Sequence, residues 1–187
     1  VGGAMGRQLF ALSRNIDLRR VTTGVRRRSV GAQRALGRRG NTMSAAEVDV
    51  VVVNLIDRIT RRMCGAGRTG RTVILRLRFD DFDRATRSHT LPRATASTDV
   101  ILAAARALVS GAAPLIAERG LTLVGFAVSN IDRGGCQQLE LPFVEQPDLV
   151  AIDCAIDQVR QRFGNGLLTR GVLVGRDPGW EMPMLPD

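Results

Sequence analysis

Three aspartates form the one carboxylate cluster in the sequence that could hold a divalent metal ion. Asp80, Asp81 and Asp83 lie between two arginine-rich segments, and carboxylate oxygens are the ligands that Mg²⁺ and Ca²⁺ prefer. The same residues suit a tight turn, because Asp side chains hydrogen-bond to nearby backbone amides. We interpret the cluster as a hairpin turn, and we keep a metal-dependent nuclease as the competing hypothesis.

No familiar catalytic signature occurs elsewhere in the chain. The sequence has no G-x-S-x-G, no G-x-x-x-x-G-K-[ST] loop and no H-E-x-x-H. The single histidine, His89, lies among Thr and Ser, where hydrogen bonding is favoured over general-base catalysis. Cys64, Cys136 and Cys154 are far apart and lack C-x-x-C spacing, so no zinc site is indicated and we expect three reduced thiols. The sequence therefore predicts no active site, metal or cofactor in this chain.

Arginine supplies all of the basic charge. The chain has 27 Arg and no Lys in 187 residues, with a formal net charge of +9. Residues 1–93 hold 20 Arg against 7 acidic residues, whereas residues 94–187 hold 7 Arg against 11. Guanidinium groups pair well with phosphate, although a GC-rich genome would also replace Lys by Arg. The uneven distribution predicts a polyanionic partner for the first half.

Hydrophobic spacing predicts two long amphipathic helices and two shorter helices. The expected helices are residues 4–13, 45–64, 99–119 and 149–163. Ser44 and Glu47 form a capping box before the second of them. Gly111 and Pro114 should kink the third helix or split it in two. No apolar run reaches the roughly 18 residues that a membrane span needs, so we expect no membrane segment.

Alternating apolar and polar residues predict the strands, with Pro92 closing the third. The expected strands are residues 26–36, 71–79, 84–91, 121–131 and, at the end, 167–174. From residue 26 to residue 131 the order is β-α-β-β-α-β. This order predicts an α+β fold in which two helices cover one face of a four-stranded antiparallel sheet. The other face would present Arg and Thr side chains to solvent or to a ligand.

Arginine and hydroxyl side chains recur along these strands, and this combination suits phosphate oxygens without reading bases. Aromatic residues make up only 4% of the chain and none is Tyr. The base-stacking platforms of single-strand binders are therefore missing, and duplex DNA is the favoured ligand over a basic face without a partner. The residues predicted to contact DNA are Arg26, Arg27, Arg28, Ser29, Gly31, Arg34, Arg76, Arg78, Arg84, Arg87, Ser88 and Thr90.

The segment from Gln138 to Phe143, Gln-Leu-Glu-Leu-Pro-Phe, follows Gly134-Gly135. Spaced apolar side chains can enter a groove on a partner while the Gln amide sets the register. Pro142 disfavours a helix and keeps the segment extended. Taken alone, the pattern fits a docking peptide and an edge strand equally well.

Several segments together resemble the C-terminal part of the Y-family translesion DNA polymerases of the DinB type. RRRSVGAQ (26–33) is similar to the first strand of the family's little finger domain, residues 70–92 to its central hairpin and residues 121–132 to its last strand. Residues 2–20 resemble the end of the thumb. The resemblance implies a domain that straddles primer-template duplex DNA and holds its backbone. Nothing matches the palm, which binds magnesium in the family, so we expect this chain to be inactive alone.

The resemblance also gives Gln138–Phe143 a role. The segment fits the family's Q-L-x-L-x-F/L motif, which binds the bacterial sliding clamp, the β subunit of the replicase. Gln138 and Leu139 take the first two positions, Leu141 and Phe143 are the anchors, and Pro142 lies between them. Some 44 residues follow the motif, so it is internal in this chain. We expect a cytoplasmic, nucleoid-associated monomer.

The implied organisation has four parts. They are the end of the thumb at 1–22, the little finger at 23–133, a flexible segment with the clamp motif at 134–148, and a C-terminal extension at 149–187. The alternative is a stand-alone RNA- or ribosome-binding α+β protein, which would have no use for the clamp motif.

Overall fold

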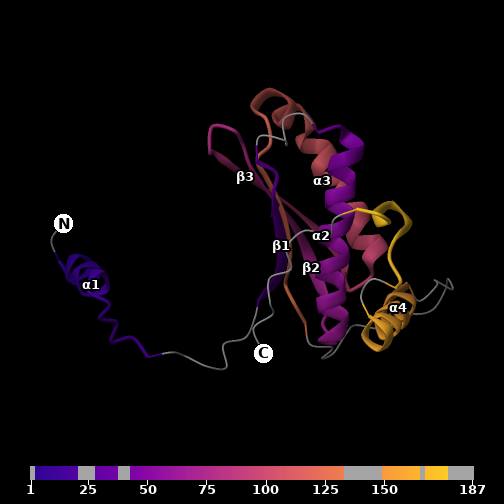
Figure 1. Ribbon diagram of the computed structural model, residues 1–187, viewed down its shortest axis with the longest axis horizontal. Coiled ribbons are helices and arrows are strands. Elements are labelled where there is room, and N and C mark those ends of the chain that lie inside the picture. Colours follow the sequence, from indigo (N-terminus) through magenta and orange to yellow (C-terminus); the bar gives the residue numbers. More distant parts are fainter. Residues whose placement is uncertain (1–2, 21–27, 38–42, 133–148, 165–166, 177–187) are drawn as a thin grey trace.

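The computed structural model describes residues 3–20, 28–37, 43–132, 149–164 and 167–176 (Figure 1). Its helices are α1 (Ala4–Ser13), α2 (Ala45–Gly65), α3 (Thr98–Arg119) and α4 (Leu149–Phe163). Its strands are β1 (Ser29–Ala35), β2 (Gly70–Arg78), β3 (Arg84–Thr95) and β4 (Leu123–Ser129). The β-α-β-β-α-β order from β1 to β4 confirms the α+β prediction.

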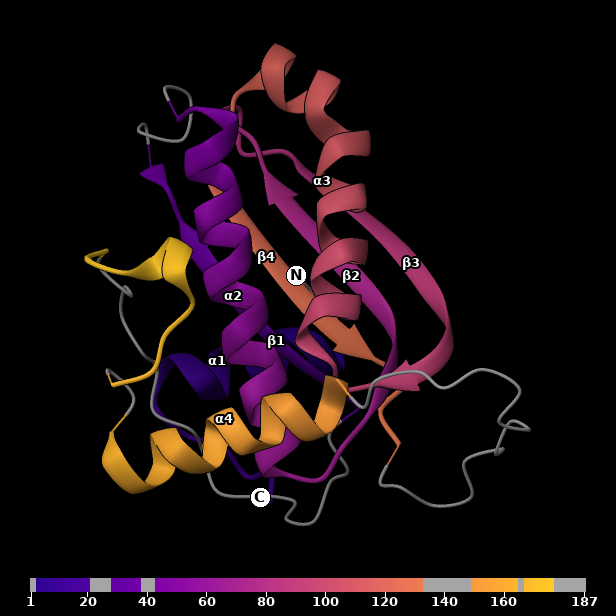
Figure 2. The same ribbon diagram turned by 90° about the vertical axis from the view of Figure 1, so that its right-hand side faces the viewer.

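The four strands form one sheet in the order β1-β4-β2-β3, and every neighbouring pair is antiparallel. Helices α2 and α3 lie side by side over one face of this sheet (Figure 2). The core lies between the two layers. Among its fully buried side chains are Leu55, Ile56, Ile59, Val73, Leu75, Phe79, Ile101, Val124 and Val128. Burial of each such side chain contributes about 1.5–3 kcal/mol to folding, so the helix layer and the sheet are firmly joined.

The capping box begins helix α2 as the sequence predicts. The Ser44 amide donates a 2.7 Å hydrogen bond to Glu47 Oε2, and the Glu47 amide donates a 3.3 Å bond to Ser44 Oγ. These bonds satisfy two amides that the first helical turn leaves without backbone partners. Gly67, with φ of +58°, redirects the chain after the helix end.

Helix α3 is continuous, so the predicted alternative of two separate helices is wrong. Pro114 lies inside it. Ser110 and Pro114 are both exposed, so water can satisfy the carbonyl group that the proline leaves without an amide donor. Within the described residues, α3 alone is long and apolar enough to cross a membrane, a property that core helices share. Its Ile101 and Ala105 are fully buried in the core.

Two strand predictions need correction. Strand β3 continues through Pro92 to Thr95. It is the outer strand of the sheet, and an edge strand tolerates a residue that has no amide hydrogen to donate. The expected strand at 167–174 is wrong, because the structure has a short 3-10 helix at Gly171–Leu173 instead.

The expectation of three reduced thiols is also wrong. Cys64 near the end of α2 and Cys154 of α4 form a disulfide, with their Cα atoms 6.0 Å apart. These cysteines are separated by 90 residues in sequence, and they meet because α4 packs against α2. The spacing of the cysteines in the sequence does not predict this contact. Cys136 lies outside the described residues.

Candidate nucleic-acid interface

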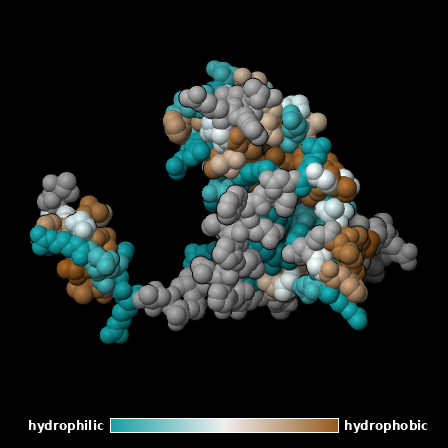
Figure 3. All heavy atoms as spheres, viewed as in Figure 1, coloured by the Kyte–Doolittle hydropathy of each residue, from teal (hydrophilic) through white to brown (hydrophobic). Residues whose placement is uncertain are grey.

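The face of the sheet opposite α2 and α3, here called the open face, is built from alternate residues of all four strands. Directly paired residues of antiparallel strands point to the same side, so the pairing of Thr72 with Thr90 and of Arg78 with Arg84 defines the face on β2 and β3. The open face consists of Ser29, Gly31, Gln33, Ala35, Thr72, Ile74, Arg76, Arg78, Arg84, Thr86, Ser88, Thr90, Leu123, Gly125, Ala127 and Ser129. In the view of Figure 3, hydrophilic side chains follow the left-hand side of the main body, away from the helices.

Small residues predominate in the part of the open face formed by β1 and β4. Gly31 pairs with Ala127, and Gly125 pairs with Gln33. A Cβ atom on Gly125 would lie 2.9 Å from Gln33 Cβ, and one on Gly31 would lie 3.0 Å from the Phe126 carbonyl oxygen. Neither position has room for a side chain, and Gly31, which is exposed on the edge strand β1, leaves its backbone open to close approach by a ligand.

Polar side chains predominate in the half of the open face formed by β2 and β3. Asn130 Nδ2 donates a 2.9 Å hydrogen bond to Thr72 Oγ1, which lies 3.1 Å from Thr90 Oγ1. Further along the same strands, Arg76 and Arg84 are exposed, and neither forms an ion pair with a residue that the structure describes. These two guanidinium groups are available to an anionic ligand.

The structure divides the predicted DNA-contacting residues into groups. Seven lie on the open face: Ser29, Gly31, Arg76, Arg78, Arg84, Ser88 and Thr90. Arg34 pairs with Val124, and Arg87 pairs with Leu75, so both arginines belong to the helix-covered side, at the two edges of the sheet. The expectation that the strand arginines share the open face is wrong for these two, because side chains alternate along a strand.

The remaining predicted residues precede β1. The sequence analysis also did not predict some residues of the open face. Arg28 is exposed just before β1, while Arg26 and Arg27 lie outside the described residues. The prediction missed Gln33, Thr86 and Gly125, which belong to the open face. For Gln33 and Thr86, the period-two spacing from predicted residues of the same strand was the available signal, but the strand register was needed to use it. Gly125 lies on β4, where no residue was predicted.

The aspartate cluster forms the turn between β2 and β3. Two of its carboxylates bind an arginine of α3. Arg119 Nη2 of α3 donates a 2.8 Å hydrogen bond to Asp83 and also binds Asp81. Its guanidinium lies 4.7 Å from the centre of the Phe79 ring. The hydrogen bonds from Arg119 hold the pKa of both carboxyl groups below the ordinary value. The hairpin-turn interpretation is confirmed, and the described residues hold no His, Cys, Asp and Glu group that could bind a metal ion.

Comparison with known families agrees with this architecture. Residues 27–141 match the impB/mucB/samB family C-terminal domain. The chain belongs to the impB/mucB/samB family. The match covers the sheet and both of its covering helices, so the open face is a feature of this C-terminal domain.

Curated relatives of this impB/mucB/samB chain are DNA polymerases IV. DNA polymerase IV 2 of Mesorhizobium japonicum is 34% identical over 186 residues, covering 92% of this chain and 44% of the relative. DNA polymerase IV of Moorella thermoacetica is 31% identical and covers 91% of this chain and 42% of the relative. The chain thus spans less than half the length of these relatives. They confirm the resemblance to the C-terminal part of DinB-type Y-family polymerases.

Proposed function

We propose that this chain is the DNA-gripping and clamp-tethering portion of a translesion DNA polymerase of the DNA polymerase IV type. The observation that carries the proposal is the open face. On it, Arg76 and Arg84 form no ion pair with a described residue, and they share the face with the hydroxyl groups of β3 and the exposed Gly31. The relatives' name, DNA polymerase IV, makes primer-template DNA the ligand that this face fits.

The chemistry of the open face favours the duplex backbone. Arginine guanidinium and hydroxyl groups bind phosphate oxygens, and the exposed Gly31 allows a sugar-phosphate chain to approach β1. None of the open-face residues is aromatic, so the face offers no platform on which unpaired bases could stack. We therefore propose sequence-independent contact with double-stranded DNA.

Fluorescence anisotropy with a labelled primer-template duplex tests this proposal. The double variant Arg76→Ala/Arg84→Ala should bind more weakly, and the slope of log affinity against log salt should fall by about 0.9 for each phosphate that the variant no longer neutralises. The control is Arg106→Ala, which removes an exposed arginine that pairs with Asp49 on the helix layer. Equal affinity and equal salt slope in wild type and the double variant would refute DNA binding by the open face.

We also propose that Gln138–Phe143 binds the bacterial sliding clamp. The segment lies outside the described residues, and the proposal rests on its match to the Q-L-x-L-x-F/L motif. Asp132 is bridged to Thr69 at the end of the sheet, and Leu149 begins a helix that packs on α2. Both flanks of the segment are therefore anchored to the domain.

The clamp proposal is tested by surface plasmon resonance against the purified bacterial clamp. Leu141→Ala/Phe143→Ala should abolish detectable binding, because it removes both apolar anchors, and should leave duplex affinity unchanged. Val144→Ala, just outside the motif, is the matched control and should bind as the wild type does. Wild-type clamp affinity in the double variant would exclude the motif as the tether.

We assign no catalytic residue to this chain. Nucleotide transfer and its magnesium ions belong, in this proposal, to a part of the polymerase that the chain does not match. The proposed organisation places the thumb end at 1–22, the little finger at 23–133, the clamp segment at 134–148 and an extension at 149–187. We propose a cytoplasmic monomer that acts on nucleoid DNA.

A further inference from the structure

Helix α4 packs against the domain with its charged side inward. Asp157 and Arg160 are only 7% and 4% exposed, whereas Ile152 and Phe163 are 55% and 60% exposed. A surface helix of a globular protein ordinarily buries its apolar side. Apolar side chains of this region are visible on the surface at the lower right of Figure 3. The contact between α4 and the domain therefore buries charged groups, and Val150 of α4 adds an apolar contact with the core.

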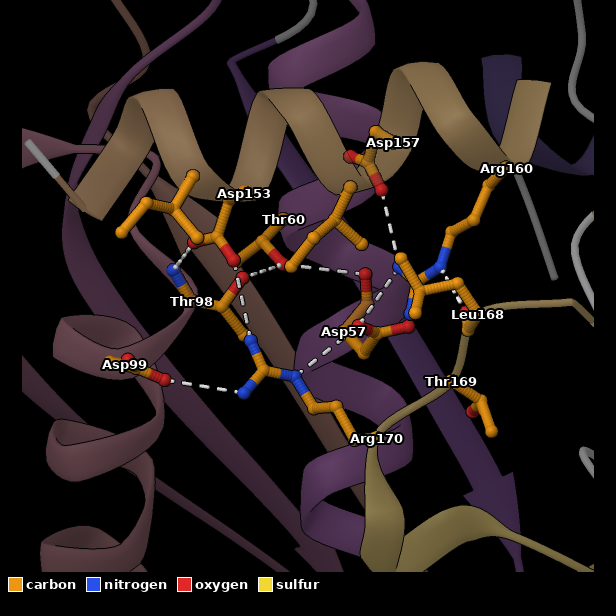
Figure 4. A pocket seen from close by; sticks show the side chains of 12 residues that line it. Asp57, Thr60, Thr98, Asp99, Asp153, Asp157, Arg160, Leu168, Thr169 and Arg170 are labelled. Carbon is orange, nitrogen blue, oxygen red and sulfur yellow. Dashed lines mark hydrogen bonds and ion pairs between the residues drawn. The ribbon is translucent and has the colours of Figure 1, made fainter. Parts of the chain in front are cut away.

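An arginine of α4 makes the central contact with α2. Arg160 Nη1 lies 3.2 Å from Asp57 Oδ1 of α2 and 3.1 Å from Asp157 Oδ1 of its own helix. Its Nε donates a 2.7 Å hydrogen bond to the Leu168 carbonyl oxygen. Arg160 thus holds α4, α2 and the following segment together (Figure 4).

Arg170 makes a second set of charged contacts from the segment after α4. In Figure 4 its guanidinium lies between Asp99 and Asp153, with nitrogen–oxygen distances of 3.2 and 3.3 Å. Asp153 Oδ2 also accepts a 2.6 Å hydrogen bond from the Thr98 amide at the start of α3. The extension formed by residues 149–176 is consequently attached to both helices of the layer through charged groups.

Such an interface stabilises the docked state weakly. Moving charged groups out of water costs free energy that ion pairing largely offsets but seldom exceeds. Burial raises the pKa of Asp157 even though Arg160 acts in the opposite direction. Undocking would expose charged groups that water solvates well, together with the apolar contacts that Val150 and Leu173 make with the core. Polar interfaces of this kind are typical of parts that separate and rejoin.

One covalent bond opposes this separation. The Cys64–Cys154 disulfide joins the same two helices, α2 and α4. Both cysteines are partly exposed, so the bond lies near the surface of the domain. Disulfides of proteins in a reducing compartment are usually transient or redox-sensing rather than structural.

We propose that Cys64 and Cys154 form a reversible latch that holds the extension on the domain when oxidised and lets it detach when reduced. A dithiol reductant opens the latch: it transfers two electrons and two protons, the sulfur–sulfur bond becomes two thiols, and the reductant becomes a disulfide. A hydroperoxide closes it. One thiol is oxidised to a sulfenic acid while the peroxide bond breaks, and the second thiol then displaces water.

Hydrogen–deuterium exchange of the whole chain, oxidised and after treatment with a dithiol, tests the latch. Amides of α4 should exchange about tenfold faster or more after reduction, since opening of α4 no longer requires strain in a covalent bond. Amides of β2 and β4 should not change. Raising the salt concentration should accelerate α4 only slightly further in the reduced protein, because salt screens the exposed Arg170–Asp99 pair but hardly affects the buried Arg160 pairs.

Two cysteine variants distinguish loss of the Cys64–Cys154 disulfide from a general loss of stability. Cys154→Ser should exchange as the reduced wild type does and should not respond to the dithiol. Cys136→Ser should keep the full response, and peroxide should restore slow exchange to it. Equal α4 exchange in oxidised and reduced wild type overturns the proposal, as does labelling of three thiols per chain in the peroxide-treated protein. Neither readout involves DNA or the clamp, so failure here leaves the proposed function untouched.

Discussion

Arg119 Nη2, in the last turn of α3, lies 2.8 Å from Asp83 Oδ2 in the turn between β2 and β3. The same nitrogen binds Asp81. This contact joins the end of the helix layer to the hairpin that carries Arg76 and Arg84 of the open face. It also neutralises the carboxylates that a metal-dependent nuclease would need.

Arg119→Ala should therefore change the titration of the turn. Loss of the guanidinium should raise the pKa of Asp81 and Asp83 toward the ordinary value of 3.8, measured by NMR of the carboxyl carbons. The folded-state pKa of both groups is lowered, so their contribution to stability is present above the unfolded pKa and is lost as the pH falls through the folded pKa. The variant should show a flatter decline of stability below about pH 4.

Arg106→Ala is the matched control for that titration. Hydrogen bonds from Arg106 lower the pKa of Asp49, so this variant should shift Asp49 and leave Asp81 and Asp83 where they are. If the two turn carboxyl groups titrate in Arg119→Ala as they do in the wild type, the ion pair does not persist in solution.

The side of the sheet on which an arginine lies should decide its effect on DNA binding. Arg84 pairs with Arg78 on the open face, whereas Arg87, three residues later, pairs with Leu75 on the other side. Arg84→Ala should weaken duplex binding and reduce the salt slope by about 0.9, the value for one phosphate contact. Arg87→Ala should leave the slope unchanged. An equal drop in both single variants, measured by anisotropy across a salt series, would contradict the assignment of the open face.

Two glycines should respond to alanine in opposite directions. A Cβ on Gly125 would approach Gln33 Cβ to 2.9 Å within the sheet, so Gly125→Ala should lower the free energy of unfolding by about 1–3 kcal/mol. Gly111 lies inside α3 with no atom near its Cβ position, so Gly111→Ala should raise it by about 0.5–1 kcal/mol. Urea denaturation measures both. Destabilisation by Gly111→Ala would show that α3 is not a regular helix at that point.

The two helix caps should differ in the same assay. Ser44 accepts a hydrogen bond from the Glu47 amide, so Ser44→Ala should cost about 1 kcal/mol of stability. Ser97 begins α3 without a side-chain cap bond, and its buried hydroxyl has no partner among the described residues. The Thr98 amide is satisfied by Asp153 instead. Ser97→Ala should therefore be neutral or slightly stabilising, and a loss as large as that of Ser44→Ala would show that the Ser97 hydroxyl does cap α3.

Local patterns in the sequence determined much of the fold. The apolar stripe and the Ser44–Glu47 box predicted α2 to within one residue at its end, and α4 was predicted at its observed bounds. The alternation along residues 71–79 predicted β2, and the order of elements predicted the sheet. These features depend on contacts between residues close in sequence, on the repeat of 3.6 residues in a helix or of two in a strand, and on turn and cap chemistry. The same reasoning found the turn at Asp81 and Asp83.

Only the tertiary structure decided which residues share a surface. The register of β1 and β3 against their neighbours placed Arg34 and Arg87 away from the open face, and the edge position of β3 allowed it to pass Pro92. The Cys64–Cys154 bond and the inward charged side of α4 follow from the packing of one helix on another across 90 residues of sequence. No local period encodes such contacts, because they depend on how whole elements pack and not on the spacing within any one of them.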